Sequence, residues 1–306
     1  MFWQTLLIGQ SFSSIQQFSV QLTEDLIWRG VILNIPFWSN EKRSGTTANL
    51  AAVSVMCTLK STYRVTLLEN HYSEKNLGKM LLPFPKAHLV KEEVIYYLGH
   101  GISDCLVPKV IKSDCIRAGG PFLEILEERL YYMLQMQAAG NLFELEFANL
   151  ILPMLRKKEQ TAQLWMIDTE CNQNVSSKIL LNEAELIVVP LRRELQSIVN
   201  FIKNFSEIKE KSIFLITDFK HYKQDSELDS LFKEEFKKEQ LIFVPDCPEF
   251  KEALNQGRCV EFISSHIGCT SEESCYIWIR TIESAADLIL MKCRKKVGDS
   301  NGEEME

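Results

Sequence analysis

The chain has 306 residues, of which 46% are hydrophobic and 25% are charged, as in an ordinary soluble globular protein with a sizeable core. The net charge of −7 makes most of the surface repel a phosphate backbone, so we expect no nucleic acid partner. No apolar run reaches the roughly 18 residues of a membrane span, so we expect no direct membrane insertion.

The nine cysteines are odd in number and scattered, without a Cys-x-x-Cys pair, which argues against a disulfide scaffold and a zinc site of paired spacing. Reduced thiols in a cytoplasmic protein are the simplest interpretation. The five histidines are dispersed, and we expect none of them to bind a metal. His71 is the exception to watch, because it follows Glu69, a candidate site residue.

Apolar runs of strand length alternate with helix-like segments along the chain. The predicted strands are residues 30–38, 63–70, 162–170, 185–191, 211–219 and 240–246. The predicted helices are residues 47–61, 73–82, 120–140, 142–158, 174–184, 193–205, 226–239, 248–258 and 274–296. Short apolar runs separated by helices are typical of parallel strands covered on both faces. We therefore predict an α/β fold with a doubly wound, mostly parallel sheet.

The predicted fold forms a single domain over residues 30–296. Residues 1–29 are too few for an independent domain, so we predict a short N-terminal extension there. Residues 297–306 are polar and acidic, and we predict a disordered tail.

The loop after the first strand, "SNEKRSGTT" (39–47), has the chemistry to hold a phosphate. Ligands of open α/β sheets bind at the carboxyl ends of the strands, and a phosphate needs backbone N–H groups at a helix N-terminus. Gly45 can take a tight backbone conformation, and Thr47 is placed to contact Mg²⁺. Lys42 and Arg43 supply positive charge.

Other features of this loop weaken the prediction. The usual further glycines and the lysine before the threonines are absent, and Arg43 and Ser44 carry side chains where backbone must approach a phosphate closely. Taken alone, the loop is also compatible with a plain strand-to-helix turn in which Thr46 caps the helix.

Three further segments follow in a known order. They are "VTLLENHYSEKNLGKML" (65–81), "LWMIDTE" (164–170) and "VPDCPEFKEALNQGRCVEF" (244–262). Together with the loop, they resemble the deviant P-loop ATPases of the MinD and ParA type, over about residues 30 to 292. The nearest branch is that of the TadZ and CpaE proteins of tight-adherence pilus assembly, which often have a degenerate Walker A loop.

The resemblance implies ATP and Mg²⁺ as cofactors. Gly45, Thr46 and Thr47 match the phosphate-binding turn, with Thr46 in the place of the usual lysine. Thr47 and Asp168 match the residues of the magnesium site. Glu69 matches the acid that helps to position the attacking water, so Glu69 and Asp168 are the catalytic candidates.

Other matched positions are less complete. Glu41 falls where the signature lysine of the family stands, and Lys42 is a possible substitute one residue away. The segment "TECNQN" (169–174) lacks the glycine that contacts the γ-phosphate. Four residues match positions around the adenine base: Thr217, Asp218, Pro245 and Asp246.

The resemblance implies an ATP-binding, weakly or non-hydrolysing localisation or assembly factor. Its partners would be proteins of an assembly or localisation machinery, with a pilus or secretion apparatus as the candidate, and a nucleotide-dependent homodimer is implied. The missing lysines matter more for hydrolysis than for binding, because one charge-stabilising donor is worth roughly 3 kcal/mol in a transition state. The alternative is a scaffold that binds no nucleotide and works through protein–protein contacts. An iron–sulfur enzyme of this fold finds no support in the cysteine spacing.

Overall fold

The computed structural model describes residues 33–71, 77–83, 122–133, 141–156, 164–171, 174–219 and 226–303. The strands are β1 (Leu33–Phe37), β2 (Val65–Asn70), β3 (Phe122–Leu126), β4 (Leu130–Met133), β5 (Leu164–Thr169), β6 (Ile187–Arg192), β7 (Ser212–Phe219) and β8 (Leu241–Pro245). The α-helices are α2 (Thr46–Lys60), α3 (Leu77–Leu81), α5 (Asn141–Glu146), α6 (Leu152–Arg156), α7 (Val175–Glu183), α8 (Leu195–Asn204), α9 (Ser226–Glu235), α10 (Pro248–Asn255), α11 (Cys259–His266) and α12 (Tyr276–Glu303). A π-helical turn, η4 (Phe147–Ile151), and two 3₁₀ turns, η5 (Ser206–Lys211) and η6 (Lys238–Gln240), complete the described elements.

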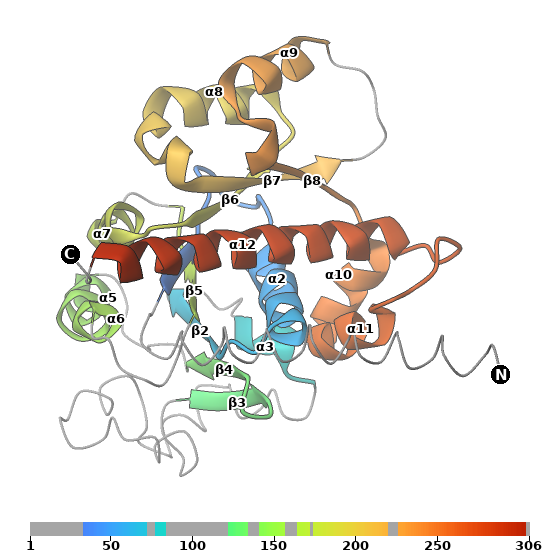
Figure 1. Cartoon of the computed structure of the whole chain (residues 1–306), viewed down its shortest axis with the longest axis horizontal. Coiled ribbons are helices and arrows are strands. Elements are labelled where there is room, and N and C mark those ends of the chain that lie inside the picture. Colours follow the sequence, from blue (N-terminus) through green and yellow to red (C-terminus); the bar gives the residue numbers. More distant parts are fainter. Residues whose placement is uncertain are drawn as a thin grey trace.

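All the described strands belong to one eight-stranded sheet in the order β3-β4-β2-β5-β1-β6-β7-β8 (Figure 1). Every neighbouring pair is parallel except β3 and β4 at one edge. The first described strand, β1, lies in the interior of the sheet, and later strands extend it toward both edges, as in a doubly wound fold. The predicted fold class, a single α/β domain with a mostly parallel sheet, is confirmed.

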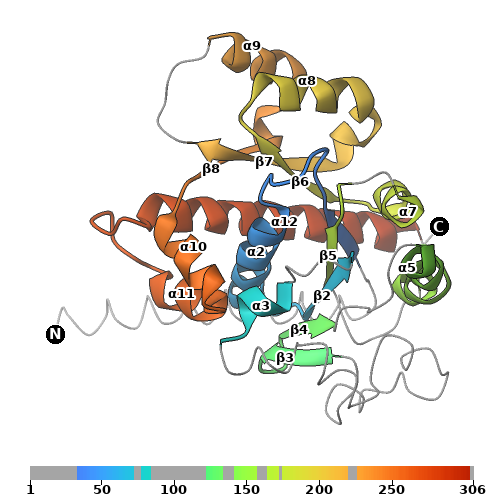
Figure 2. The same cartoon turned by 180° about the vertical axis from the view of Figure 1, so that it is seen from behind.

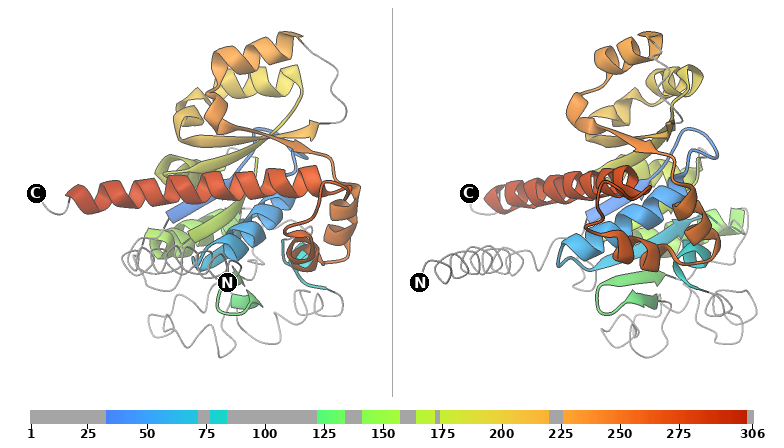
Figure 3. Two further views of the ribbon diagram at one scale, coloured as in Figure 1. Left: turned by 45° about the vertical axis from the view of Figure 1, so that its right-hand side comes forward. Right: turned by 90° about the vertical axis from the view of Figure 1, so that its right-hand side faces the viewer.

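Helices cover both faces of the sheet (Figures 2 and 3). On one face α2, α3, α10, α11 and α12 share a core with the strands, and the long α12 lies across α2. On the other face lie α7, α8 and α9 beside one end of the sheet and α5 and α6 beside the other. Val188 and Val189, neighbours on β6, belong to opposite cores because successive side chains of a strand point to opposite faces.

The predicted helix over residues 120–140 is wrong for residues 122–133, the part that the structure describes, because β3 and β4 form an antiparallel hairpin there. All residues of β4, Leu130–Met133, are buried, and the strand pairs with β2. In the turn Glu128 has a φ of 56°, which a helix does not allow. The apolar residues have helical spacing, but hydrogen bonding to β2 and burial on both faces decide in favour of a strand.

The C-terminal region also differs from the prediction. Helix α11 was not predicted. Helix α12 continues to Glu303, so residues 297–303 are helical where their composition predicts disorder. No helix within the described ranges is both long and apolar enough to cross a bilayer. The predicted extension, residues 1–29, lies outside the described residues.

Gly257 holds the chain after α10 close to the chain after α3. Its φ is +68°, and a Cβ there would lie 2.0 Å from the carbonyl oxygen of Leu82. We expect Gly257→Ala to lower the free energy of unfolding by more than the ~1–2 kcal/mol that a left-handed conformation costs a residue with a Cβ. Denaturant titration measures the loss.

Gly268→Ala is the matched control. Gly268 has a φ of +78°, but a Cβ there would meet nothing within 4 Å. Gly268→Ala should therefore lower the free energy of unfolding only by the cost of the left-handed backbone. Equal losses for both variants would contradict the close approach of Gly257 to Leu82.

Candidate functional site

The site lies where three neighbouring parallel strands end. β5 runs between β1 and β2, and its Asp168 pairs in register with Phe37 on one side and with Glu69 on the other. The carboxyl ends of these strands therefore meet at one edge of the sheet, beside the loop that leads from β1 into α2. This register brings Glu69 and Asp168 together as the sequence predicts.

Hydroxyl groups hold the loop from β1 to α2 in place. Ser44 is buried, and its Oγ donates to the carbonyl oxygen of Glu41 at 3.3 Å and lies 3.2 Å from Oγ1 of Thr46. Oγ1 of Thr217, on β7, lies 3.2 Å from the carbonyl oxygen of Ser44 and 3.3 Å from that of Leu191, and its hydroxyl donates to these carbonyls. Thr217, predicted to flank a base, thus braces this loop.

The backbone of the loop is shaped for an anion. Gly45 has a φ of 82° and stands at the N-cap of α2, with no side-chain hydrogen bond to the cap. Its carbonyl oxygen accepts hydrogen bonds from both N and Nδ2 of Asn49 at 2.9 Å. Thr46 is thus the first residue of the helix and not its cap. The N–H groups of the first turn remain for a ligand, at the positive end of the helix dipole.

Arg43 also has a left-handed backbone, with a φ of 65°. This conformation costs a residue with a Cβ about 1 to 2 kcal/mol. Strain of this kind is often found at ligand sites, where the surrounding structure enforces it. Gly45, two residues later, is also left-handed. A Cβ added there would lie 3.1 Å from Nδ2 of Asn49, so both the backbone conformation and the close contact favour glycine at this position.

A cavity of about 490 Å³ opens between this loop and the ends of β2 and β5. The residues that line it are Glu41, Lys42, Arg43, Gly45, Thr46, Thr47, Ala48, His71, Met80, Asp168, Thr169, Glu170 and Cys171. Its volume lies in the range of small-molecule sites. The structure therefore brings together most of the predicted phosphate-loop residues and the predicted magnesium ligands Thr47 and Asp168.

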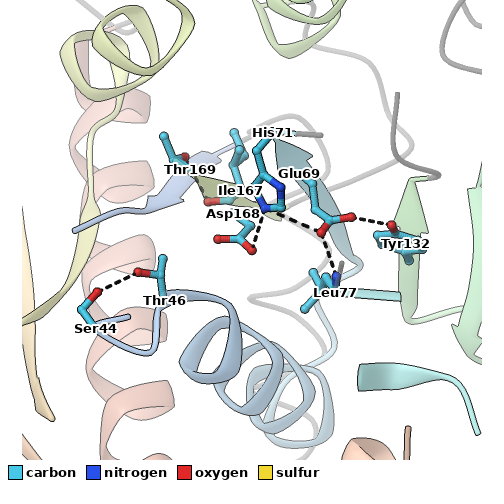
Figure 4. A network of polar contacts seen from close by, with 9 residues as sticks. All are labelled: Ser44, Thr46, Glu69, His71, Leu77, Tyr132, Ile167, Asp168 and Thr169. Atoms are coloured by element: carbon cyan, nitrogen blue, oxygen red, sulfur yellow. Dashed lines mark hydrogen bonds and ion pairs between the residues drawn. The ribbon is translucent and has the colours of Figure 1, made fainter. Parts of the chain in front are cut away.

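A histidine stands between the two acids of the site (Figure 4). Nε2 of His71 lies 3.2 Å from Oδ2 of Asp168 and 3.7 Å from Oε1 of Glu69. Glu69 is only 1% exposed; its carboxylate accepts hydrogen bonds from Tyr132 OH at 2.5 Å and from the N–H of Leu77 at 2.7 Å. Glu69 thus lies behind His71 and does not line the cavity.

The charges of this cluster depend on one another. Burial raises the pKa of Glu69 to about 7, against the opposing effect of the His71 charge. Burial by itself would lower the pKa of His71, but the hydrogen bond and charge of Asp168 outweigh it and raise that pKa to about 9. The three ligand atoms lie within 4.8 Å of one another, a spacing that could hold a metal ion. At neutral pH the protonated imidazole of His71 therefore supplies, between the two carboxylates, the positive charge that a metal ion could otherwise supply.

The other residues predicted to hold the base lie outside the cavity. Asp246 forms an ion pair with Lys251, and Pro245 ends β8. Asp218 belongs to β7, and only its backbone is described.

Five residues of the cavity lining were not predicted from the sequence: Ala48, Met80, Thr169, Glu170 and Cys171. The last three directly follow Asp168, and their place at the end of a strand was a signal for them. Met80 lies on α3 and had no such signal.

The strain at Arg43 leads to a prediction. We expect Arg43→Gly to raise the free energy of unfolding by up to about 1 kcal/mol, because glycine accepts the left-handed backbone and loses only part of this gain to chain entropy. The same change should weaken the binding of a triphosphate, because a guanidinium leaves the cavity lining. Denaturant titration and equilibrium binding of ATP measure the two effects.

Glu128→Gly is the control, since Glu128 has a φ of 56° in the β3–β4 turn and does not line the cavity. It should relieve the same strain without altering ATP binding. Unchanged ATP affinity in Arg43→Gly would remove this arginine from the site.

No protein-family model and no curated protein sequence matches the chain. Solved structures are similar over most of their length. The cell division ATPase MinD of Pyrococcus furiosus has a TM-score of 0.56 at 12% identity, covering 85% of this chain and 98% of that one. A ParA family ATPase of Chlorobium tepidum has a TM-score of 0.55 at 12% identity, covering 84% and 98%. The septum site-determining protein MinD of Pyrococcus horikoshii, complexed with Mg-ADP, has a TM-score of 0.54 at 12% identity, covering 89% and 98%.

At these identities the likeness concerns the fold. The chain has the single α/β domain of the ParA and MinD ATPases, so the predicted resemblance to them is confirmed at the level of architecture.

Proposed function

We propose that this protein binds ATP with Mg²⁺, hydrolyses it weakly or not at all, and acts as a MinD/ParA-like localisation or assembly factor. One observation carries the proposal. The uncapped N-terminus of α2, preceded by the left-handed Gly45, opens into the same cavity as the carboxylate of Asp168. Phosphate and magnesium chemistry would thus meet within one cavity, in a fold whose MinD neighbour was solved with Mg-ADP.

Each part of the nucleotide has a candidate partner. The N–H groups at the start of α2 would hold the phosphates, and the exposed Lys42 and Arg43 would add positive charge. The hydroxyl of Thr47 and the carboxylate of Asp168 are hard oxygen ligands of the kind that Mg²⁺ prefers. These donors fit the ion, which would supply charge neutralisation to the bound phosphates.

Slow hydrolysis follows from the residues that would surround the bound phosphates. Phosphoryl transfer depends on positioning and on charge stabilisation. Thr46 and Glu41 stand in the places of two lysines, so the transition state loses positive charge. Glu69, the proposed acid for the attacking water, is reached from the cavity only if His71 moves, because its carboxylate is buried behind that ring.

The proposed client apparatus and the proposed homodimer both rest on the sequence resemblance. The TadZ and CpaE branch suggests a pilus or secretion apparatus as the client of a cytoplasmic protein. A nucleotide-dependent homodimer would let Lys42, exposed at the mouth of the cavity, reach the nucleotide of a second copy.

The second candidate function is a scaffold without nucleotide. The cavity lining favours it, because three carboxylates, those of Glu41, Asp168 and Glu170, oppose the cations there. His71 already neutralises Asp168. Such a protein would act only through protein–protein contacts.

Calorimetry with Mg-ATP separates the two. We expect the wild type to bind, and Thr47→Ala and Asp168→Asn to bind about 10- to 100-fold more weakly, since contacts to charged groups are worth about 1.5 to 3 kcal/mol each. Removal of Mg²⁺ with EDTA should weaken the wild type and change the two variants less.

Thr281→Ala, which removes an exposed hydroxyl on α12, is the control and should bind like the wild type. Thermal melts confirm that each variant is folded. No heat from the folded wild type would refute ATP binding and favour the scaffold.

A further inference from the structure

A second group of metal-ligating side chains lies away from the cavity, where α11 ends and the chain turns into α12. A ring nitrogen of His266, a carboxylate oxygen of Glu273 and Sγ of Cys275 lie within 4.8 Å of one another. Cys275 is 3% exposed, His266 is partly buried and Glu273 is exposed, so the group reaches from the core to the surface. The proposed nucleotide chemistry uses none of these residues.

A second thiol, that of Cys269, neighbours Cys275. Burial raises the pKa of Cys275, and the nearby thiol of Cys269 raises it further. Both cysteines are free thiols, as is the buried Cys247 at the start of α10. The segment "HIGCTSEESC" (266–275) therefore offers one imidazole, two thiols and two carboxylates within ten residues, and Glu273 is the carboxylate that lies near His266 and Cys275.

The imidazole of His266 is oriented in the way that a metal ligand needs. Its Nδ1 is 2.7 Å from the carbonyl oxygen of Phe262, so Nδ1 carries the proton and Nε2 keeps its lone pair. Metal-binding histidines usually donate their other ring nitrogen to a carbonyl or carboxylate in this manner. The ring also packs on Phe262, with 4.4 Å between the ring centroids, which limits its rotation.

Hydrogen bonds hold the rest of the segment in place. The N–H of Thr270 donates to Oε1 of Glu273 at 3.1 Å, which orients the carboxylate. Ser274 Oγ donates to Oε1 of Glu249 at 2.7 Å and ties the segment to α10. These contacts orient the ligands from outside, as outer-shell contacts do in metal sites.

We propose that His266, Cys269, Glu273 and Cys275 bind a zinc ion. Four ligands of nitrogen, sulfur and oxygen suit the tetrahedral preference of Zn²⁺, whereas Mg²⁺ and Ca²⁺ take oxygen ligands. The ion joins the C-terminal end of α11 to the segment that enters α12. Its ligands include a histidine and a glutamate, so the site does not need the paired cysteine spacing Cys-x-x-Cys.

The test uses the full chain, purified in reducing buffer without chelator. We expect about one equivalent of zinc by mass spectrometry of the metal, and Co²⁺ substitution should give the absorption bands of a thiolate-bound tetrahedral ion. Cys269→Ser and Glu273→Gln alter side chains that are not fully buried, so they should leave the fold intact. Each should weaken Zn²⁺ binding at least 10-fold, because even outer-shell changes cost about 10- to 100-fold.

Two control variants match these changes. Glu272→Gln alters the neighbouring exposed carboxylate, and Cys293→Ser alters a buried thiol of α12 outside the cluster. Both should bind zinc like the wild type.

A wild type without tighter Zn²⁺ binding than Cys269→Ser would overturn the proposal, as would a Cys269–Cys275 disulfide in reducing buffer. ATP does not enter this test, so its outcome is separate from that of the nucleotide proposal.

Discussion

The in-register pairing of β1, β5 and β2 is the constraint on which the candidate nucleotide site depends. Because the three strands run parallel and Asp168 lies level with Phe37 and Glu69, their ends form one edge. Helix α2 starts at this edge and is fixed there by its own burial, since most of its residues from Asn49 to Thr58 belong to the core. The direction of its N-terminus therefore cannot change without breaking the packing of the whole face.

The buried acids require compensation, and His71 supplies it. Two carboxyl groups at the end of neighbouring strands would repel each other if both were charged and desolvated. The imidazole between them offsets this repulsion, while the hydroxyl of Tyr132 and the N–H of Leu77 donate hydrogen bonds to Glu69. A magnesium ion at Asp168 would thus compete with a charge that the protein carries itself. Magnesium binding at Asp168 should therefore be weaker than at a carboxylate that has no ion-pair partner.

The two candidate cation sites differ in chemistry in a way that follows from their place in the fold. At the end of β5 the available groups are a hydroxyl and a carboxylate, which favour a hard ion beside phosphates. At the α11–α12 junction the groups are sulfur and nitrogen with one carboxylate, which favour a softer ion without a substrate. The first site opens into a cavity, and the second joins the end of α11 to the segment that enters α12, so their roles should be ligand binding and support of the fold.

The sequence by itself determined the α/β class, most of the central strands and the position of the loop at residues 39–47, because apolar runs with helical partners are local signals. The resemblance to the MinD and ParA ATPases also pointed to Asp168 and Glu69, whose positions match acids of that family. The sequence pattern mistook the hairpin at residues 122–133 for part of a helix and missed α11, because pairing with β2 and packing against α2 are not local. Only the tertiary structure decided that Thr217 braces Ser44, that Glu69 lies behind His71, and that His266 meets Cys275. Thr217 and Ser44 meet across distant segments, and the other two arrangements depend on how the chain turns in space, which the spacing of residues along the sequence does not record.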